Sequence, residues 1–140
     1  MFAQIAVGSI LIALTILVTA GFIGIAIAAG NRVGDRLLVG HRTLRLIVFL
    51  TAMTLWMVAA LSIAVWLWAA GFMILGVFTT PEDALYFSAV SFTTLGFGDV
   101  LLEKPWRLLS GFIAANGLIL FSLATAFLIE AIRRVYQAHE

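Results

Sequence analysis

Long apolar runs alternate with short clusters of charged residues along this chain. Charged residues are absent from four stretches, residues 1–31, 46–81, 84–98 and 108–129. A bilayer core of about 30 Å needs about 20 apolar residues for each spanning helix. Only the stretch at 84–98 is too short for this, so the pattern predicts three transmembrane helices and one shorter excursion.

Arginine placement predicts how these helices are oriented. The segment "NRVGDRLLVGHRTLR" carries four arginines against one aspartate, and Arg133 and Arg134 follow the last apolar run. Short basic segments beside spanning helices stay in the cytoplasm. We therefore expect a multi-pass protein of the plasma membrane, of the prokaryotic inner-membrane type, with its N-terminus outside, its C-terminus in the cytoplasm and the short excursion entering from outside.

Two features predict contacts between the helices. Ala20, Gly24 and Ala28 recur at every fourth position, a spacing that lets membrane helices approach closely, although small residues are also simply common here. Aromatic side chains near the outer end of the second helix, Trp66, Trp68 and Phe72, are expected at the membrane surface, whereas Trp56 lies deeper and is expected to pack.

Composition excludes several classes of function. The chain is 64% hydrophobic and 11% charged, which is not the composition of a soluble domain. Its net charge of +1 provides no basic face for nucleic acid. There is no cysteine, and the two histidines lie far apart, so neither a thiolate metal site nor a catalytic site is expected. We expect no enzyme activity and no organic cofactor.

Residues 81–92 predict a helix with a well-defined start. Thr80 is a good N-cap, Pro81 suits the first helical position, and Glu82 and Asp83 place negative charge in the first turn. Asp83 is also placed to close a capping box with Thr80. Twelve residues make a helix of about 18 Å, which is too short to cross the membrane.

The backbone after this helix, residues 93–99, is then left within the membrane. Non-helical backbone at that depth must be buried in protein or line a water-filled path. Gly96 and Gly98 permit positive φ at alternate residues, which would let successive carbonyls of residues 94–97 point to one side. Such a row can replace the water around a dehydrated cation.

The string "TTLGFGD" at residues 93–99 resembles the selectivity filter of the tetrameric potassium channels, written T-T-V-G-Y-G-D. The resemblance implies an all-α membrane fold, in which three transmembrane helices are joined by a re-entrant pore helix and filter loop. It covers a pore domain at residues 44–132, between a peripheral first helix (1–30) with a basic loop (31–43) and a tail (133–140). Within that domain it implies an outer helix (44–75), the pore helix (81–92), the filter (93–99) and an inner helix (106–130).

The same resemblance implies roles for individual residues. Permeant K⁺ would be bound by Thr94, Leu95, Gly96, Phe97 and Gly98. Thr94 would supply its hydroxyl and carbonyl to the innermost ion site, and Gly98 would turn the chain outward. The filter would be supported by Thr93, Asp99, Tyr86, Phe87 and Val90.

Two filter positions depart from the family pattern. Leu95 replaces a β-branched residue whose stiffer side chain suits the packed rear of the filter. Phe97 replaces a tyrosine and lacks the hydroxyl that would bond to the pore helix, a loss of about 1 kcal/mol per subunit.

Asn116 and Gly117 interrupt the apolar run of the last helix. Asn116 either faces a water-filled cavity or bonds across a helix interface. Gly117 either permits bending during gating or allows close packing.

Taken together, the resemblance implies a homotetramer in membrane lipid that conducts K⁺ passively. A weakly selective monovalent cation channel and a non-conducting accessory subunit are the alternatives.

Overall fold

The computed structural model describes residues 2–33 and 42–137, and this part of the chain contains four α-helices and no strand. The helices are α1 (Phe2–Val33), α2 (Arg42–Ile74), α3 (Pro81–Phe92) and α4 (Leu108–Gln137). Three of them are long and apolar enough to cross a membrane. The predicted all-α membrane fold is confirmed, and so are its three spans.

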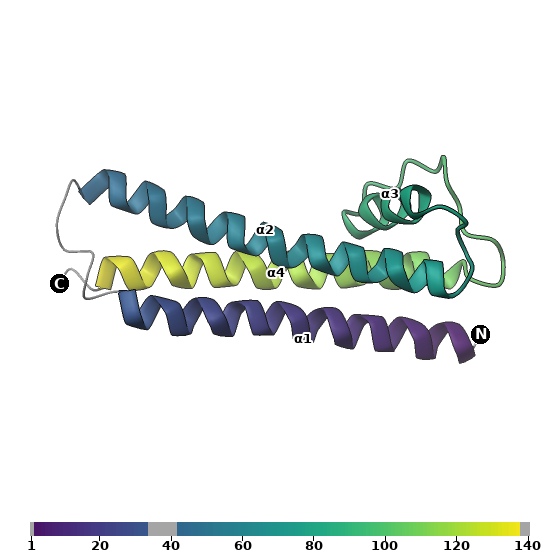
Figure 1. Ribbon diagram of the computed structural model, residues 1–140, viewed down its shortest axis with the longest axis horizontal. Coiled ribbons are helices and arrows are strands. Elements are labelled where there is room, and N and C mark those ends of the chain that lie inside the picture. The colour runs from purple at the N-terminus through teal and green to yellow at the C-terminus, as the bar shows by residue number, and fades with distance from the viewer. Residues whose placement is uncertain (1, 34–41, 138–140) are drawn as a thin grey trace.

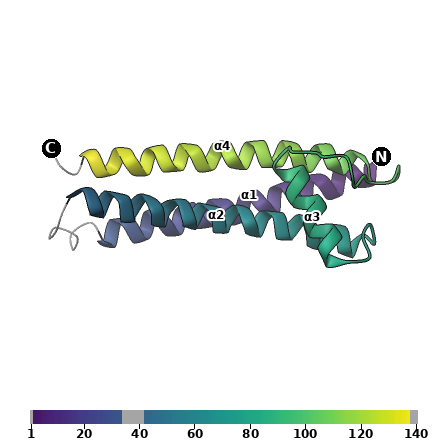
Figure 2. The same ribbon diagram turned by 90° about the horizontal axis from the view of Figure 1, so that it is seen from above.

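The three long helices lie alongside one another, and α3 sits at one end of this bundle (Figure 1). The N-terminus lies at the same end as α3, and the last turns of α4 lie at the opposite end (Figure 1). Seen from above, α3 runs between α2 and α4 and contacts both (Figure 2). The short excursion and the N-terminus therefore share one end of the bundle.

The helix boundaries differ slightly from those expected. α1 continues to Val33 and α2 begins at Arg42, so the described helices extend into the expected basic loop at 31–43. The remainder of that loop lies outside the described residues. α4 starts at Leu108 and continues to Gln137, past the expected end of the inner helix at residue 130.

A glycine ends α2 and turns the chain toward α3. Gly76 has a φ of 66°, and its N–H donates to the Met73 carbonyl at 3.0 Å. The Val77 N–H donates to the Phe72 carbonyl, also at 3.0 Å. These two bonds define a Schellman motif, which satisfies the last carbonyls of the helix and needs a left-handed residue at the position of Gly76.

The buried core lies at the end of the bundle that carries α3. It draws on all four helices and on the loop before α4, with its large members Trp68, Phe72, Phe92, Leu109 and Ile113. The Phe72 ring packs edge-on against Phe87 at a centroid distance of 5.4 Å. Trp68 and Phe72 are fully buried, so the expectation that they lie at the membrane surface is wrong, whereas Trp66 is 57% exposed.

α1 packs closely against the other helices, but not through the stripe of small residues. Gly24 has no neighbouring heavy atom within 4 Å of where a Cβ would lie. The close approaches occur instead at Gly8, against the Phe112 ring of α4, and at Gly71, against the Leu11 side chain. Trp56 packs as expected, and its Nε1 donates to the Phe22 carbonyl of α1 at 2.9 Å.

The closest approach between helices joins α4 to the end of α3. A Cβ on Gly117 would overlap the carbonyl oxygen of Phe92, the last residue of α3. Gly117 lies nine residues after the start of α4. This contact therefore places the end of α3 about 14 Å along a spanning helix, near the middle of a core about 30 Å thick.

We expect Gly117→Ala to destabilise the protein, because the added methyl group has to displace backbone rather than a flexible side chain. Overpacking of this kind costs about 1–3 kcal/mol. Gly111→Ala, on the same helix with no atom near its would-be Cβ, should keep or slightly raise stability. Thermal unfolding in detergent, followed by circular dichroism, compares the two variants, and equal midpoints would contradict the close contact.

Candidate functional site

The start of α3 is fixed by its cap. The Thr80 hydroxyl accepts the Asp83 N–H at 3.1 Å and donates to the Asp83 carboxylate at 2.6 Å. Thr80 itself is extended, Pro81 occupies the first turn, and Glu82 and Asp83 supply the predicted negative charge. The contact differs from a full capping box because the carboxylate bonds the hydroxyl of Thr80 rather than its backbone N–H.

The chain folds back onto the end of α3. The N–H groups of Thr93 and Thr94 donate to the carbonyls of Ala89 and Ser91, each at 3.0 Å. The N–H groups of Leu95 and Gly96 both donate to the Val90 carbonyl, at 3.0 and 3.3 Å. Four consecutive amides therefore bond to three carbonyls in the last turn of the helix, those of Ala89, Val90 and Ser91.

These bonds determine where the carbonyls of the loop point. In a planar trans peptide the N–H of one residue points opposite to the C=O of the residue before it. The described chain has no cis peptide. The carbonyls of Thr93, Thr94 and Leu95 therefore point away from α3. Among the described residues, no hydrogen bond ends on the carbonyl oxygen of any residue from 93 to 98.

Backbone handedness alternates along the loop. Thr94, Gly96 and Gly98 have φ values of 60°, 55° and 81°, whereas Leu95 and Phe97 between them do not have positive φ. The positive φ predicted at the two glycines is confirmed. The positive φ at Thr94 was not predicted, because non-glycine residues rarely adopt it.

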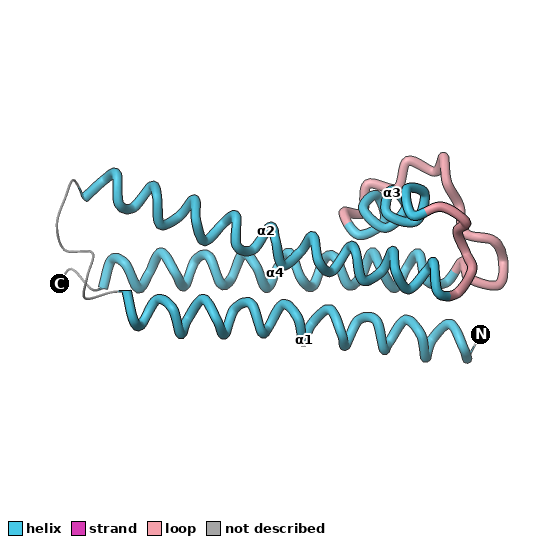
Figure 3. Tube along the Cα trace, in the orientation of Figure 1, coloured by secondary structure: helices cyan, strands magenta, loops and turns pink. Residues whose placement is uncertain are grey.

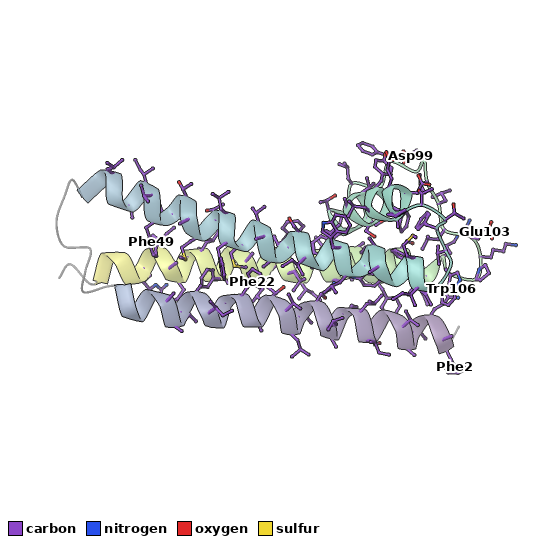
Figure 4. The ribbon with its side chains drawn as sticks, viewed as in Figure 1. Phe2, Phe22, Phe49, Asp99, Glu103 and Trp106 are labelled. Atoms are coloured by element: carbon purple, nitrogen blue, oxygen red, sulfur yellow. The ribbon has the colours of Figure 1, made fainter. Side chains whose placement is uncertain are left out.

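A side-chain bond closes the C-terminal part of the loop. The Tyr86 hydroxyl of α3 donates to the Asp99 carboxylate at 2.6 Å. This bond lowers the pKa of Asp99 and raises the pKa of Tyr86 relative to their ordinary values. Asp99 lies on the loop beyond α3, away from the three long helices (Figure 4). At the N-terminal end of the loop, the Thr93 hydroxyl donates to the Ala89 carbonyl at 2.8 Å.

Most of the predicted site residues meet around one cavity. The cavity has a volume of about 280 Å³, and its lining includes Tyr86, Phe87, Val90, Thr94, Gly96, Gly98 and Asp99. The Leu95 and Phe97 side chains do not line it and are 59% and 66% exposed. The loop that holds these residues joins α3 to α4 (Figure 3).

Asn116 and Gly117 lie apart from this cavity. Asn116 is fully buried, and its Nδ2 donates to the Thr15 hydroxyl of α1 at 2.8 Å. The cavity-facing expectation for Asn116 is therefore wrong, because the amide bonds across a helix interface. Gly117 packs against Phe92, so its contact corresponds to the close-packing alternative.

The exposed face of α4 carries two hydroxyls that the sequence analysis did not select. This face recurs every three or four residues at Gly111, Ala115, Leu118, Ser122, Thr125 and Ile129. Ser122 and Thr125 donate to carbonyls one turn earlier, at 2.8 and 2.9 Å. Two hydroxyl residues three positions apart in an apolar helix are the signal that could have identified them.

Comparison with known families agrees with this geometry. A family model described as an ion channel matches residues 58–134, which is more than half of the chain. The chain belongs to the ion channel family. The matched region holds all of α3 and the loop after it, and it leaves α1 outside. No curated protein and no solved structure matches the chain.

The channel's Tyr86–Asp99 bond leads to a pH prediction. A carboxylate whose pKa is lowered stabilises the folded site above the pKa of an unfolded aspartate, about 4, and loses this effect as pH falls through its lower folded value. A tyrosine whose pKa is raised stabilises the site below about 10 and loses this effect as pH rises through its higher folded value. We therefore expect the sustained ion current to decline at acid pH, as Asp99 becomes protonated, and at alkaline pH, as Tyr86 loses its proton.

Tyr86→Phe and Asp99→Ala should each shorten the time for which the current is sustained at neutral pH, because each removes the same bond. The double variant should be no worse than either single variant. Asp83→Asn removes an equal charge but leaves the Tyr86–Asp99 bond, and it serves as the control. Recordings in planar bilayers measure the effect, and additive losses in the double variant would show that the bond is not the shared cause.

Proposed function

We propose that this channel conducts K⁺ passively through a filter formed by residues 93–99 of four identical chains. The observation that carries the proposal is the loop backbone itself. The amides of residues 93–96 bond to the end of α3, and the carbonyls of residues 93–98 have no hydrogen-bond partner among the described residues. Carbonyl oxygens in this state can replace the water around a cation that enters the membrane.

Ion binding in the proposal follows the predicted filter residues. Thr94 contributes its hydroxyl and its carbonyl to the innermost site, and Leu95, Gly96 and Phe97 contribute the carbonyls above it. Gly98 turns the chain outward to Asp99. The alternation of φ at Thr94, Gly96 and Gly98 supports this assignment, because a strand of uniform handedness points its successive carbonyls to opposite sides.

A single chain supplies oxygens from one side only, so the proposal requires several copies around an axis. Potassium filters use four such loops. The exposed side chains of Leu95 and Phe97 support a homotetramer, because large apolar groups beside the loop are covered when neighbouring copies pack there. No covalent step is involved, and the permeant K⁺ is cargo rather than a cofactor.

The proposed orientation places α3 at the outer face of a plasma membrane of the prokaryotic inner-membrane type. The end of α1 at Val33, the start of α2 at Arg42 and the last turns of α4 lie at the end of the bundle opposite α3 (Figure 1). The sequence is rich in arginine beside these helix ends, so this end is the cytoplasmic one by the positive-inside rule. Ions that leave the filter would then move inward along the exposed face of α4, past Ser122 and Thr125.

Flux measurements on purified protein in liposomes test the proposal. Potassium flux well above sodium flux is the expected result. In mild detergent, the purified protein should form a particle of four chains. Equal fluxes would favour the weakly selective cation channel, for which Phe97 without a hydroxyl is the specific reason. No flux, together with a stable complex with a different protein, would identify an accessory subunit.

We expect Gly96→Ala to lower the ratio of K⁺ to Na⁺ permeability, because alanine resists the left-handed backbone at a cost of about 1–2 kcal/mol. Gly76→Ala is a matched control. Both glycines have positive φ and open space around a would-be Cβ, but Gly76 lies in the turn after α2. An equal change in the two variants would show general strain rather than a filter effect.

The channel contains no cysteine, so an introduced thiol is unique. We expect a charged, water-soluble thiol reagent to block Ser122→Cys channels, because this face of α4 lines the ion path. Ser62→Cys on α2 is the control, since Ser62 is also exposed and bonds the carbonyl one turn earlier at 2.8 Å. Block of both variants, or of Ser62→Cys alone, would contradict the assignment of the α4 face.

A further inference from the structure

The α1 helix is tied to the pore domain by polar bonds at three levels. Near its start, the Gln4 side-chain oxygen accepts the first N–H of α4, at Leu108, at 3.2 Å. In its middle, Thr15 bonds to Asn116. Further along, the Phe22 carbonyl accepts from Trp56 of α2. Because each bond fixes a different part of α1, the helix cannot slide along α4 without breaking at least one of them.

The middle bond is fully buried, and the Thr15 hydroxyl lies within hydrogen-bond distance of both ends of the Asn116 amide, 2.8 Å from Nδ2 and 3.2 Å from Oδ1. Thr15 and Asn116 have no exposed surface. The Thr15 hydroxyl accepts from Asn116 and donates to the Ile12 carbonyl at 2.9 Å. A buried amide is costly when it has no partner, so the α4 turn that holds Asn116 is stable only where Thr15 meets it.

Gly117, the next residue of the same turn, contacts the residue that precedes the proposed filter. Gly117 lies against the carbonyl of Phe92, and Phe92 directly precedes Thr93, the first residue of the filter. The contact has no room for even one methyl group. A close-packed contact between two backbones transmits a displacement that a flexible side chain would absorb.

We propose that α1 holds the Asn116–Gly117 turn of α4 against the base of the filter, and that Thr15 is a positioning residue for ion selectivity. This rests on the proposed potassium conduction and adds to it a role for the helix that lies outside the matched ion channel region. α1 would thus be a working part of the pore rather than only a membrane anchor.

The experiment compares Thr15→Val with Thr19→Val. Both threonines are fully buried on α1, but the Thr19 hydroxyl bonds only within α1, to the Thr15 carbonyl at 2.9 Å. Each variant loses one buried hydroxyl, so thermal stability should fall in both. Only Thr15→Val should lower the K⁺ to Na⁺ permeability ratio, by about 2- to 30-fold, the range found for residues that act on a site from a distance. Thr15→Ser keeps the hydroxyl and should keep the parent ratio.

Asn116→Leu breaks the same bond from the α4 side. It leaves no buried amide without a partner, and the Thr15 hydroxyl still bonds to the Ile12 carbonyl. It should assemble and show the same fall in the ratio. Parent ratios in Thr15→Val and Asn116→Leu, or an equal fall in Thr19→Val, would overturn the positioning role while potassium conduction stands. A parent protein that passes no K⁺ would overturn both proposals.

Discussion

The backbone that follows α3 has to satisfy its polar groups at a depth where water is scarce, and the rest of this structure depends on how it does so. Unpaired amides in the hydrocarbon region cost several kcal/mol each. The solution is local, because four successive N–H groups bond to the last carbonyls of α3. A peptide that turns its N–H toward the helix must turn its C=O away. Satisfying the donors therefore produces the row of free acceptors on which ion binding would depend.

This arrangement requires that the end of α3, a helix only twelve residues long, is held in place by its neighbours. The aromatic cluster of Phe72, Phe78 and Phe87 holds α3 against the end of α2. On the other side, Gly117 lets α4 approach the Phe92 carbonyl directly. Glycine is needed here for proximity, in contrast to Gly96, where it is needed for positive φ. α1 adds a further contact on the far side of α4, through the bond between Thr15 and Asn116. These two residues lie far apart in the sequence and meet only in the folded chain.

Features set by neighbouring residues could be predicted from the sequence, whereas features set by distant ones could not. The bounds of α3 and the positive φ of Gly96 and Gly98 follow from a cap, a proline and two glycines, all of which act locally. The partner of Asn116 lies 101 residues away, so the sequence allowed a cavity as readily as an interface. Trp68 was misplaced for the same reason, since it is buried in a core to which all four helices contribute. Close approach at Gly8 rather than Gly24 likewise depends on which helix faces α1.

In the proposed filter, the departures at Leu95 and Phe97 would alter how the loop is held more than where its backbone runs. Phe97 has no hydroxyl, so it cannot tie the outer half of the filter to the pore helix. Across residues 93–99, side-chain bonds reach α3 only from the two ends, through Thr93 to Ala89 and through Asp99 to Tyr86. The outer end thus depends on a carboxylate whose charge Tyr86 stabilises. In a filter of the usual sequence a neutral hydroxyl would share that task. Here the attachment of this end depends on the charge of one acid, so the proposed filter would be more sensitive to pH on that side of the membrane than its backbone alone would be.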